Sequence, residues 1–182
     1  MWLLIVLFIV LVVLAWVLVT YNGLVRLRNR TENSWAQVDV QLKKRYDLVP
    51  NIVEAVRGYA AHEKSTFESV VQARNAAQSA TSVPEQAAAE GMLTTALRQV
   101  FALAENYPQL RASEGFQTLQ AQLADIEGDI AVSRQIYNDT ILTYNNKVET
   151  VPSNLIASAT GFERRAFFEI DSDGRSVPKV EF

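Results

Sequence analysis

The chain has 182 residues, with 17 Lys and Arg against 20 Asp and Glu and an apolar content of 49%. Every charged side chain lies beyond residue 20, so these averages hide an uncharged N-terminal segment. This split excludes both a plain soluble globule and a disordered polymer. The absence of Cys excludes a disulfide framework, thiol catalysis, an iron–sulfur cluster and a lipoprotein-type Cys anchor.

The N-terminal segment Trp2–Val19 is an unbroken apolar run. As a helix it spans about 27 Å, which is enough to cross a bilayer core. A cleaved signal peptide would need a basic start and a small-x-small cleavage site, whereas here Ala15 is followed by Trp16. The sequence therefore predicts a retained transmembrane anchor over residues 1–20, with membrane-interface aromatics at Trp2, Trp16 and Tyr21.

A basic segment follows the anchor. Between residues 21 and 45 basic side chains outnumber acidic ones, and beyond residue 45 the excess reverses. The basic side chains are Arg26, Arg28, Arg30, Lys43, Lys44 and Arg45. Because positive charge beside a span marks the cytoplasmic side, we expect the N-terminus outside the cell and the domain in the cytoplasm. The segment either rests on anionic lipid head groups or forms an ordinary solvated helix face.

A long helix is expected from Trp35 onward, because apolar residues recur at spacings of three and four. They are Trp35, Val38, Leu42, Tyr46, Val49, Val53, Val56 and Ala60. The pattern carries through Pro50, which favours one kinked helix over a new helix capped by Asp47. The same face could continue through Phe67 and Val70 toward Ala77.

A break is predicted at residues 78–84, where Ser82 and Glu85 match a capping box with Pro84 in the first turn. The next helix would end at Pro108 and turn inward Met92, Leu93, Ala96, Leu97, Val100, Phe101 and Ala104. Ser113 can cap a third long helix, which would run to Pro152. Its nearly heptad face comprises Phe116, Leu119, Leu123, Ile126, Ile130, Ser133, Tyr137, Ile141, Tyr144 and Val148.

The expected fold class is all-α, with a transmembrane helix followed by an elongated antiparallel bundle of long helices. A short helix over about 153–160 would end at Gly161, and the tail would form either a short hairpin or an extended segment docked on the bundle. The predicted organisation is an anchor (1–20), a basic juxtamembrane segment (21–34), a helical bundle (35–160) and a C-terminal tail (161–182).

Catalytic and metal-binding patterns are missing from the sequence. His62-Glu63 begins like a zinc-protease helix, but residue 66 is Thr where the second His ligand would be needed. Asp125 and Asp129 share a helix face, yet no Glu-x-x-His partner exists. The acidic domain also lacks the basic–aromatic pattern of nucleic-acid binding. We therefore expect no enzymatic activity, no metal, no cofactor and no nucleic-acid partner.

Three aromatic–Asn pairs stand out: Tyr21-Asn22, Tyr137-Asn138 and Tyr144-Asn145. Tyr137 and Tyr144 lie one heptad apart, so their Asn neighbours line up beside the apolar stripe. One interpretation is polar filling of a bundle interior, with each Tyr hydroxyl finding a partner. The other is a surface for interaction.

Four segments resemble the LemA family. They are YNGLVRLRNRTENSWAQVDVQLKKRYDLVPNIVEAVRGYAAHE (21–63), LAENYPQLRASEGFQTLQAQLADIEGDIAVSRQIYND (103–139), GFERRAFFEI (161–170) and VPKVEF (177–182). The resemblance covers nearly the whole chain in order. Thr31 departs from the pattern, since the family commonly has an apolar residue there.

The resemblance implies a bacterial inner-membrane protein with a single N-terminal span and a long helical bundle, and it implies no established activity, catalytic residue or cofactor. The family pattern marks Asn22, Arg28, Asn29, Trp35, Tyr46, Asp47, Pro50, Asn51, Glu63, Glu105, Asn106, Tyr107, Pro108, Tyr137, Asn138, Asn145, Pro152, Gly161 and Phe162. Many of these are polar, so we expect a specific packing or assembly surface as well as a core.

The expected function is a membrane-anchored, non-catalytic helical scaffold that self-assembles into a homo-oligomer at the bacterial inner membrane. Its partners would be the lipid bilayer and further copies of the chain. The alternative is a monomeric or low-order adaptor that binds a membrane, signalling or stress-response partner.

Overall fold

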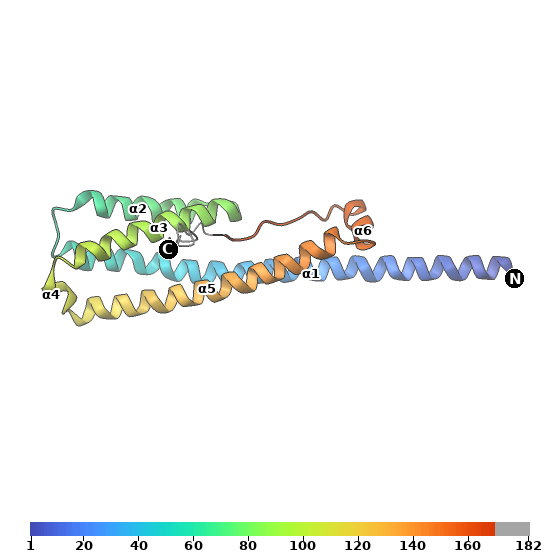
Figure 1. Cartoon of the computed structure of the whole chain (residues 1–182), viewed down its shortest axis with the longest axis horizontal. Helices are drawn as coiled ribbons and strands as arrows, with labels where there is room; N and C mark the ends of the chain where they lie inside the picture. The colour runs from blue at the N-terminus through green and yellow to red at the C-terminus, as the bar shows by residue number, and fades with distance from the viewer. Residues whose placement is uncertain (170–182) are drawn as a thin grey trace, which may run out of the picture. The chain divides into compact units, whose positions relative to one another are not determined.

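The computed structural model describes residues 1–169, which form six α-helices and no strand (Figure 1). The helices are α1 (Trp2–Arg57), α2 (Lys64–Ser79), α3 (Val83–Ala104), α4 (Pro108–Arg111), α5 (Glu114–Glu149) and α6 (Ser153–Ala159). The predicted all-α helical bundle with a long apolar N-terminal helix is confirmed. One of the two predictions for the tail was a short hairpin. It falls on residues from position 170 onward, which lie outside the part of the chain that the structure describes.

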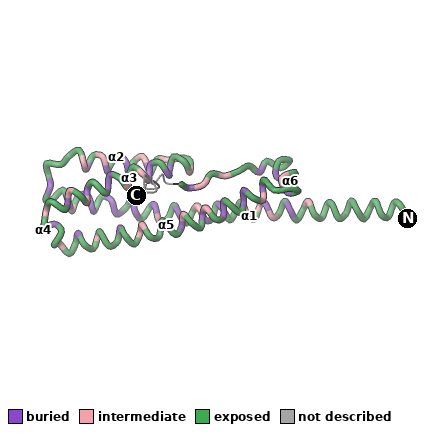
Figure 2. Tube along the Cα trace, viewed as in Figure 1, coloured by how far each residue is buried: buried purple, intermediate pink, exposed green. Residues whose placement is uncertain are grey.

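The first helix, α1, joins the apolar run to the helical body without interruption. Residues 2–19 are exposed except for the half-buried Val17, and regular burial begins at Thr20 and Leu24 (Figure 2). α1 is long and apolar enough to cross a membrane. Pro50 lies inside α1, so the prediction of a helix continuous through this residue is confirmed. Pro50 is exposed, which lets its ring face solvent.

The expectation that this helix could continue toward Ala77 is wrong. α1 ends at Arg57, and a turn over residues 58–63 leads into α2. Gly58 lowers the helix propensity at this point, and the amide of Tyr59 bonds the Val56 carbonyl at 3.0 Å in a tighter turn. The apolar spacing persists because Phe67 and Val70 are buried too, but they reach the core from a second helix.

The α2–α3 connection has the predicted capping arrangement. The Ser82 hydroxyl accepts the Glu85 amide at 3.4 Å, and Pro84 occupies the first turn. The Glu85 carboxylate in return accepts the Thr81 amide at 3.1 Å and the Thr81 hydroxyl at 3.0 Å. These bonds lower the pKa of Glu85, because they favour its charged form.

The predicted faces of α3 and α5 are mostly correct. Leu93, Ala96, Leu97, Val100 and Ala104 of α3 are buried as expected. Met92 is instead exposed, and Phe101 is only half-buried. Met92 immediately precedes Leu93, and the two neighbours point about 100° apart on a helix, so only one of them can face the core centre. α5 ends at Glu149, before Pro152, which follows a cis peptide bond.

The end of α6 explains the glycine at position 161. Gly161 has φ of 74°, a left-handed conformation that favours glycine. The Phe162 amide then bonds back to the Ala157 carbonyl at 2.9 Å, and both residues belong to one apolar cluster. This is the Schellman arrangement, in which a hydrophobic contact accompanies the helix stop.

The chain divides into two compact units. Among the described residues, unit 1 comprises Met1–Val38 and Ser133–Ala166, and unit 2 comprises Asp39–Val132 and residues 167–169. α1 and α5 contribute residues to both units. The core of unit 1 includes Leu24, Tyr144, Val148, Ala157 and Phe162. In unit 2, apolar residues of α1, α2, α3 and α5 are buried, among them Leu42, Ile52, Val70, Leu93 and Ile130.

Candidate functional site

In unit 1, side chains of α5 bind the backbone of the segment that follows α6. We call residues 162–166 the tail segment. The Tyr137 hydroxyl donates to the Ala166 carbonyl at 3.0 Å, and the Tyr144 hydroxyl donates to the Glu163 carbonyl at 2.9 Å. The Asn145 amide donates to the Arg165 carbonyl at 3.0 Å, and its oxygen accepts the Arg165 amide at 2.9 Å. The three side chains therefore hold an extended segment mainly through its backbone.

The heptad spacing of α5 explains this arrangement. Tyr137 and Tyr144 lie on one helix face, and burial raises the pKa of both hydroxyls, so both remain donors. Asn145 is buried beside them. The hydroxyls thus find partners, and the partners are carbonyls of the tail segment. The sequence marked these tyrosines and Asn145 but did not identify what they bind.

The tail segment also contacts α1 through Arg165. One guanidinium nitrogen of Arg165 donates to the Thr31 hydroxyl at 2.9 Å, and the other lies 2.8 Å from the Glu32 carboxylate. The Thr31 hydroxyl itself donates to the Arg28 carbonyl at 2.7 Å. Thr31, the position that departs from the family pattern, is fully buried and satisfied on both sides. The tail segment therefore links α1 to α5.

Direct contacts between α1 and α5 complete this region. The Ser34 and Thr140 hydroxyls are hydrogen-bonded at 2.8 Å, and both are buried. The ring centroids of Trp35 and Tyr137 are 5.1 Å apart. Phe162 packs edge-on against Tyr21 at 5.9 Å. The motif residues Trp35, Tyr137, Asn145, Gly161 and Phe162 thus come together in unit 1.

In unit 2, a buried ion-pair cluster is formed by Arg45, Tyr46, Gln86 and Glu90. The Arg45 and Glu90 side chains expose 1% and 0% of their surface, and their closest nitrogen and oxygen are 2.8 Å apart. The Tyr46 hydroxyl donates to Glu90, and Gln86 donates to the Tyr46 hydroxyl at 2.7 Å. Arg45 also contacts Thr94 at 2.8 Å and Glu127 at 3.0 Å.

This cluster corrects one expectation from the sequence, since Arg45 is buried and cannot reach lipid head groups as part of the basic segment. The signal was available: Arg45 follows Leu42 by three residues, and Glu90 precedes Leu93 by three, so both lie at core spacing. Burial raises the pKa of Glu90 and of the Tyr46 hydroxyl. Glu90 is fully enclosed, and the cluster joins α1 to α3 and, through Glu127, to α5.

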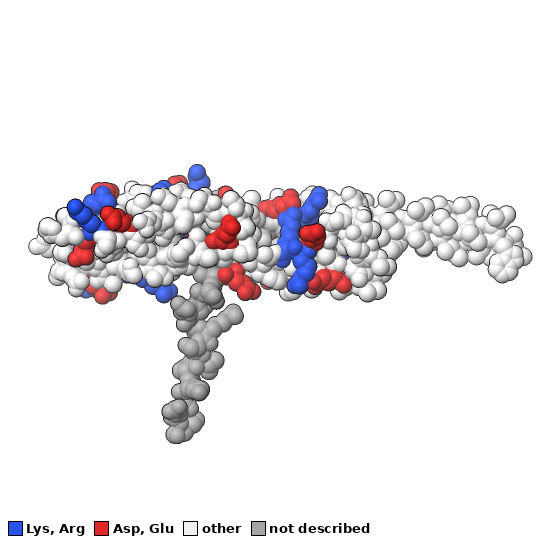
Figure 3. Space-filling view, turned by 90° about the horizontal axis from the view of Figure 1, so that it is seen from above, with Lys and Arg blue, Asp and Glu red and all other residues white. Residues whose placement is uncertain are grey.

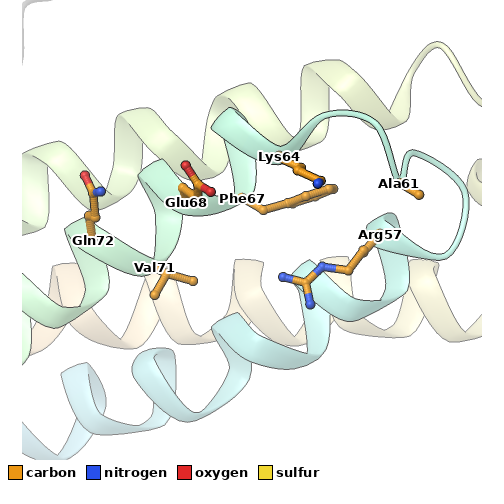
Figure 4. A pocket seen from close by; sticks show the side chains of 7 residues that line it. All are labelled: Arg57, Ala61, Lys64, Phe67, Glu68, Val71 and Gln72. Atoms are coloured by element: carbon orange, nitrogen blue, oxygen red, sulfur yellow. The ribbon is translucent and has the colours of Figure 1, made fainter.

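A hollow of about 480 Å³ lies at the α1–α2 turn. Figure 4 shows its lining, which is Arg57, Ala61, Lys64, Phe67, Glu68, Val71 and Gln72. The Arg57 guanidinium lies 5.6 Å from the centroid of the Phe67 ring and 2.7 Å from the Glu54 carboxylate. These partners occupy the charged head of Arg57, and the lining contains no nucleophile beside a base.

The remaining marked residues are spread over the surface. Exposed positions are Asn22, Asn29, Asp47, Pro50, Asn51, Glu63, Glu105, Asn106 and Pro108, while Tyr107 and Asn138 are half-buried. The residues predicted to lie at the membrane interface are also exposed: Trp2, Trp16, Tyr21, Arg26, Arg28 and Arg30. Within residues 1–169, no three His, Asp or Glu side chains gather as a metal site.

Removing one partner of the buried ion pair should be costly. Glu90→Ala leaves the buried Arg45 guanidinium with only the partly exposed Glu127 carboxylate as an ionic partner, so we expect the free energy of unfolding to fall by about 3 kcal/mol. Urea unfolding of the detergent-solubilised protein, followed by circular dichroism, measures this. Glu54→Ala removes the exposed partner of Arg57 and should cost about 0–1 kcal/mol. Equal losses in the two variants would contradict a structural role for the cluster.

Releasing the tail segment should expose it to protease. Asn145→Ala removes both bonds to the Arg165 backbone, so we expect trypsin to cleave faster after Arg164 or Arg165. Asn146→Ala changes the neighbouring, exposed asparagine and should leave that rate unchanged. Mass spectrometry of timed digests gives both rates. An unchanged rate in the Asn145 variant would show that other contacts hold the segment.

Known proteins match most of the chain. Magnetosome protein MamQ 2 of Paramagnetospirillum magneticum is 26% identical, over 86% of this chain and 67% of that protein. Magnetosome protein MamQ of Magnetospirillum gryphiswaldense is 25% identical, over 83% of this chain and 65% of that protein. Protein LemA of Metamycoplasma hominis is 24% identical, over 81% of this chain and 68% of that protein. The LemA family matches residues 34–182, and the chain belongs to this family.

Proposed function

We propose that this protein is a membrane-anchored, non-catalytic helical scaffold that self-assembles at the bacterial inner membrane. The observation that carries the proposal is the continuity of α1, which runs from the exposed apolar residues into the core of both units. Residues 1–20 are the anchor in this proposal, and residues 21–34 are the juxtamembrane segment. Family membership and the similarity to MamQ fit a membrane-associated, non-enzymatic protein.

The exposure of the apolar run supports its role as a membrane anchor. Nearly every side chain from Trp2 to Val19 is exposed in the folded chain, so the rest of the protein removes little of this apolar surface from water. Burial is worth roughly 25 cal/mol per Å² of apolar surface, which makes an aqueous environment for such a run very unfavourable. A bilayer core covers a helix of this length on every side.

A groove on the α2–α3 pair supports self-assembly. The groove is open and is lined largely by small residues: Ser69, Ala73, Ala76, Ala87, Ala88, Gly91 and Ala96. Small side chains let another helix approach closely. The apolar side chains of Val71 and Met92 are exposed nearby, and a second copy would remove them from water.

The mass of the detergent-purified protein tests self-assembly. We expect a discrete oligomer in light scattering coupled to size exclusion at micromolar concentration. Met92→Glu places a charge in the groove and should lower the mass, because the charge would be buried without a partner. Ala102→Glu, on an exposed part of α3 that does not line this groove, should leave the mass unchanged.

A monomer in that measurement would favour the adaptor, the second candidate function. The exposed motif residues Glu63, Glu105, Asn106 and Pro108 support it, because their exposure leaves them available to a partner. Glu63 lies in the α1–α2 connection, Glu105 and Asn106 lie in the α3–α4 connection, and Pro108 begins α4. All of these segments lie at one end of unit 2 (Figure 1). Crosslinking in cells would then yield one recurrent partner, whereas a scaffold would yield mainly self-crosslinks.

The proposed orientation places the helical units in the cytoplasm, following the excess of basic residues after the span. The chain has no Cys, so His62→Cys introduces a single thiol in the exposed α1–α2 turn. We expect a membrane-impermeant maleimide to label it only after the inner membrane is opened. Labelling in cells with an intact inner membrane would reverse the orientation and leave the anchor unaffected.

A further inference from the structure

The turn before α6 and α6 itself form an uncharged, apolar surface in unit 1. Residues 150–162 contain no Asp, Glu, Lys or Arg. Val151 and Leu155 expose 79% and 64% of their surface, more than most large apolar residues outside the N-terminal run. The opposite side of α6 is used, because Ala157 and Ile156 pack on the unit 1 core. The exposed side chains therefore remain available without unfolding α6.

The position of α6 along α1 places this surface beside the proposed membrane. Ala157 and Phe162 share a cluster with Leu24, and Phe162 also contacts Tyr21. Along the helix axis, Leu24 lies about 7.5 Å beyond Val19, the last residue of the apolar run. The polar layer on each side of a bilayer core is about 5–8 Å thick. α6 therefore packs beside the part of α1 that would cross this polar layer, close to the N-terminal run (Figure 1).

Charged groups lie just beyond this uncharged surface. The Arg164 guanidinium is 2.7 Å from the Glu149 carboxylate, and the Arg28 guanidinium lies 5.4 Å from the centroid of the Phe162 ring. Figure 3 shows Lys and Arg gathered in a band across one face, with Asp and Glu beside and among them, and uncharged surface between the band and the N-terminal run. This order of apolar, uncharged and then charged surface matches the layers of a membrane interface.

We propose that α6 and the turn before it are a second membrane contact, with Val151 and Leu155 inserted at the boundary between lipid head groups and acyl chains. The occupant of this surface is the bilayer that holds the α1 anchor, so the inference rests on the proposed anchoring. Short apolar side chains on a helix lying in the interface plane insert to this depth. The contact fixes the rotation of unit 1 about the α1 axis, because α6 lies on one side of α1.

Single spin labels test the contact in the full-length protein reconstituted into nanodiscs of phosphatidylethanolamine and phosphatidylglycerol. Val151→Cys and Leu155→Cys are the test positions, and both change exposed side chains of a chain without Cys. Leu11→Cys in the apolar run is the lipid reference. Ile136→Cys is the water reference, since Ile136 is 44% exposed and lies about 20 Å back along α5 from its C-terminal end.

Power saturation gives the accessibility of each label to oxygen, which enters lipid, and to a nickel chelate, which stays in water. We expect the ratio of oxygen to nickel accessibility at positions 151 and 155 to lie between the ratios at 11 and 136. Ratios equal to that at 136 would overturn the α6 contact while leaving the anchor intact. A water-like ratio at position 11 would instead overturn the proposed anchor.

One further outcome would show that a protein, and not lipid, covers this surface. Low accessibility to both reagents at 151 and 155, together with spin–spin broadening between copies, would mean that a second copy covers Val151 and Leu155. That result overturns the lipid contact. Diluting labelled chains with unlabelled ones removes such broadening, which provides the control. Circular dichroism should be the same for all four variants, because each replaces an exposed side chain.

Discussion

The continuity of α1 as one helix is the constraint on which the rest of the structure depends. The first part of α1 is apolar and almost entirely exposed, and from Thr20 onward only one face is buried. A helix satisfies its own backbone groups, so it can pass from lipid to water without an unpaired segment. A turn between the two parts would decouple the units from the anchor, and α1 has none before Arg57.

The two units use polar groups in different ways. In unit 2, Arg45 of α1 and Glu90 of α3 are fully buried, and their side chains bind each other. In unit 1, Tyr137, Tyr144 and Asn145 bind backbone atoms of the tail segment. Side chains of the segment also contribute, because Phe162 packs in the core and the Arg165 guanidinium reaches Thr31.

Local rules predicted most of the fold. The cap at Ser82, the stripe of α5 and the glycine stop at Gly161 all depend on residues close in sequence, where spacing and propensity act directly. The turn after Arg57 was missed because an apolar stripe of period 3.6 continues across it. Spacing places Arg45 and Glu90 at core positions, but it does not pair them. The partners of Arg45 and Thr31 lie 45 and 134 positions away, and periodicity carries no information about which residues pair over such separations.

The bond between Thr31 and Arg165 also has a consequence for the order of biosynthesis. The two residues are separated by 134 positions, so unit 1 cannot close until residue 165 has left the ribosome. α1, α2 and α3 are made long before that point, and the α2–α3 pair can form from local contacts. The tail segment is therefore the last part of unit 1 to be made, and it docks on an α1 helix that already exists.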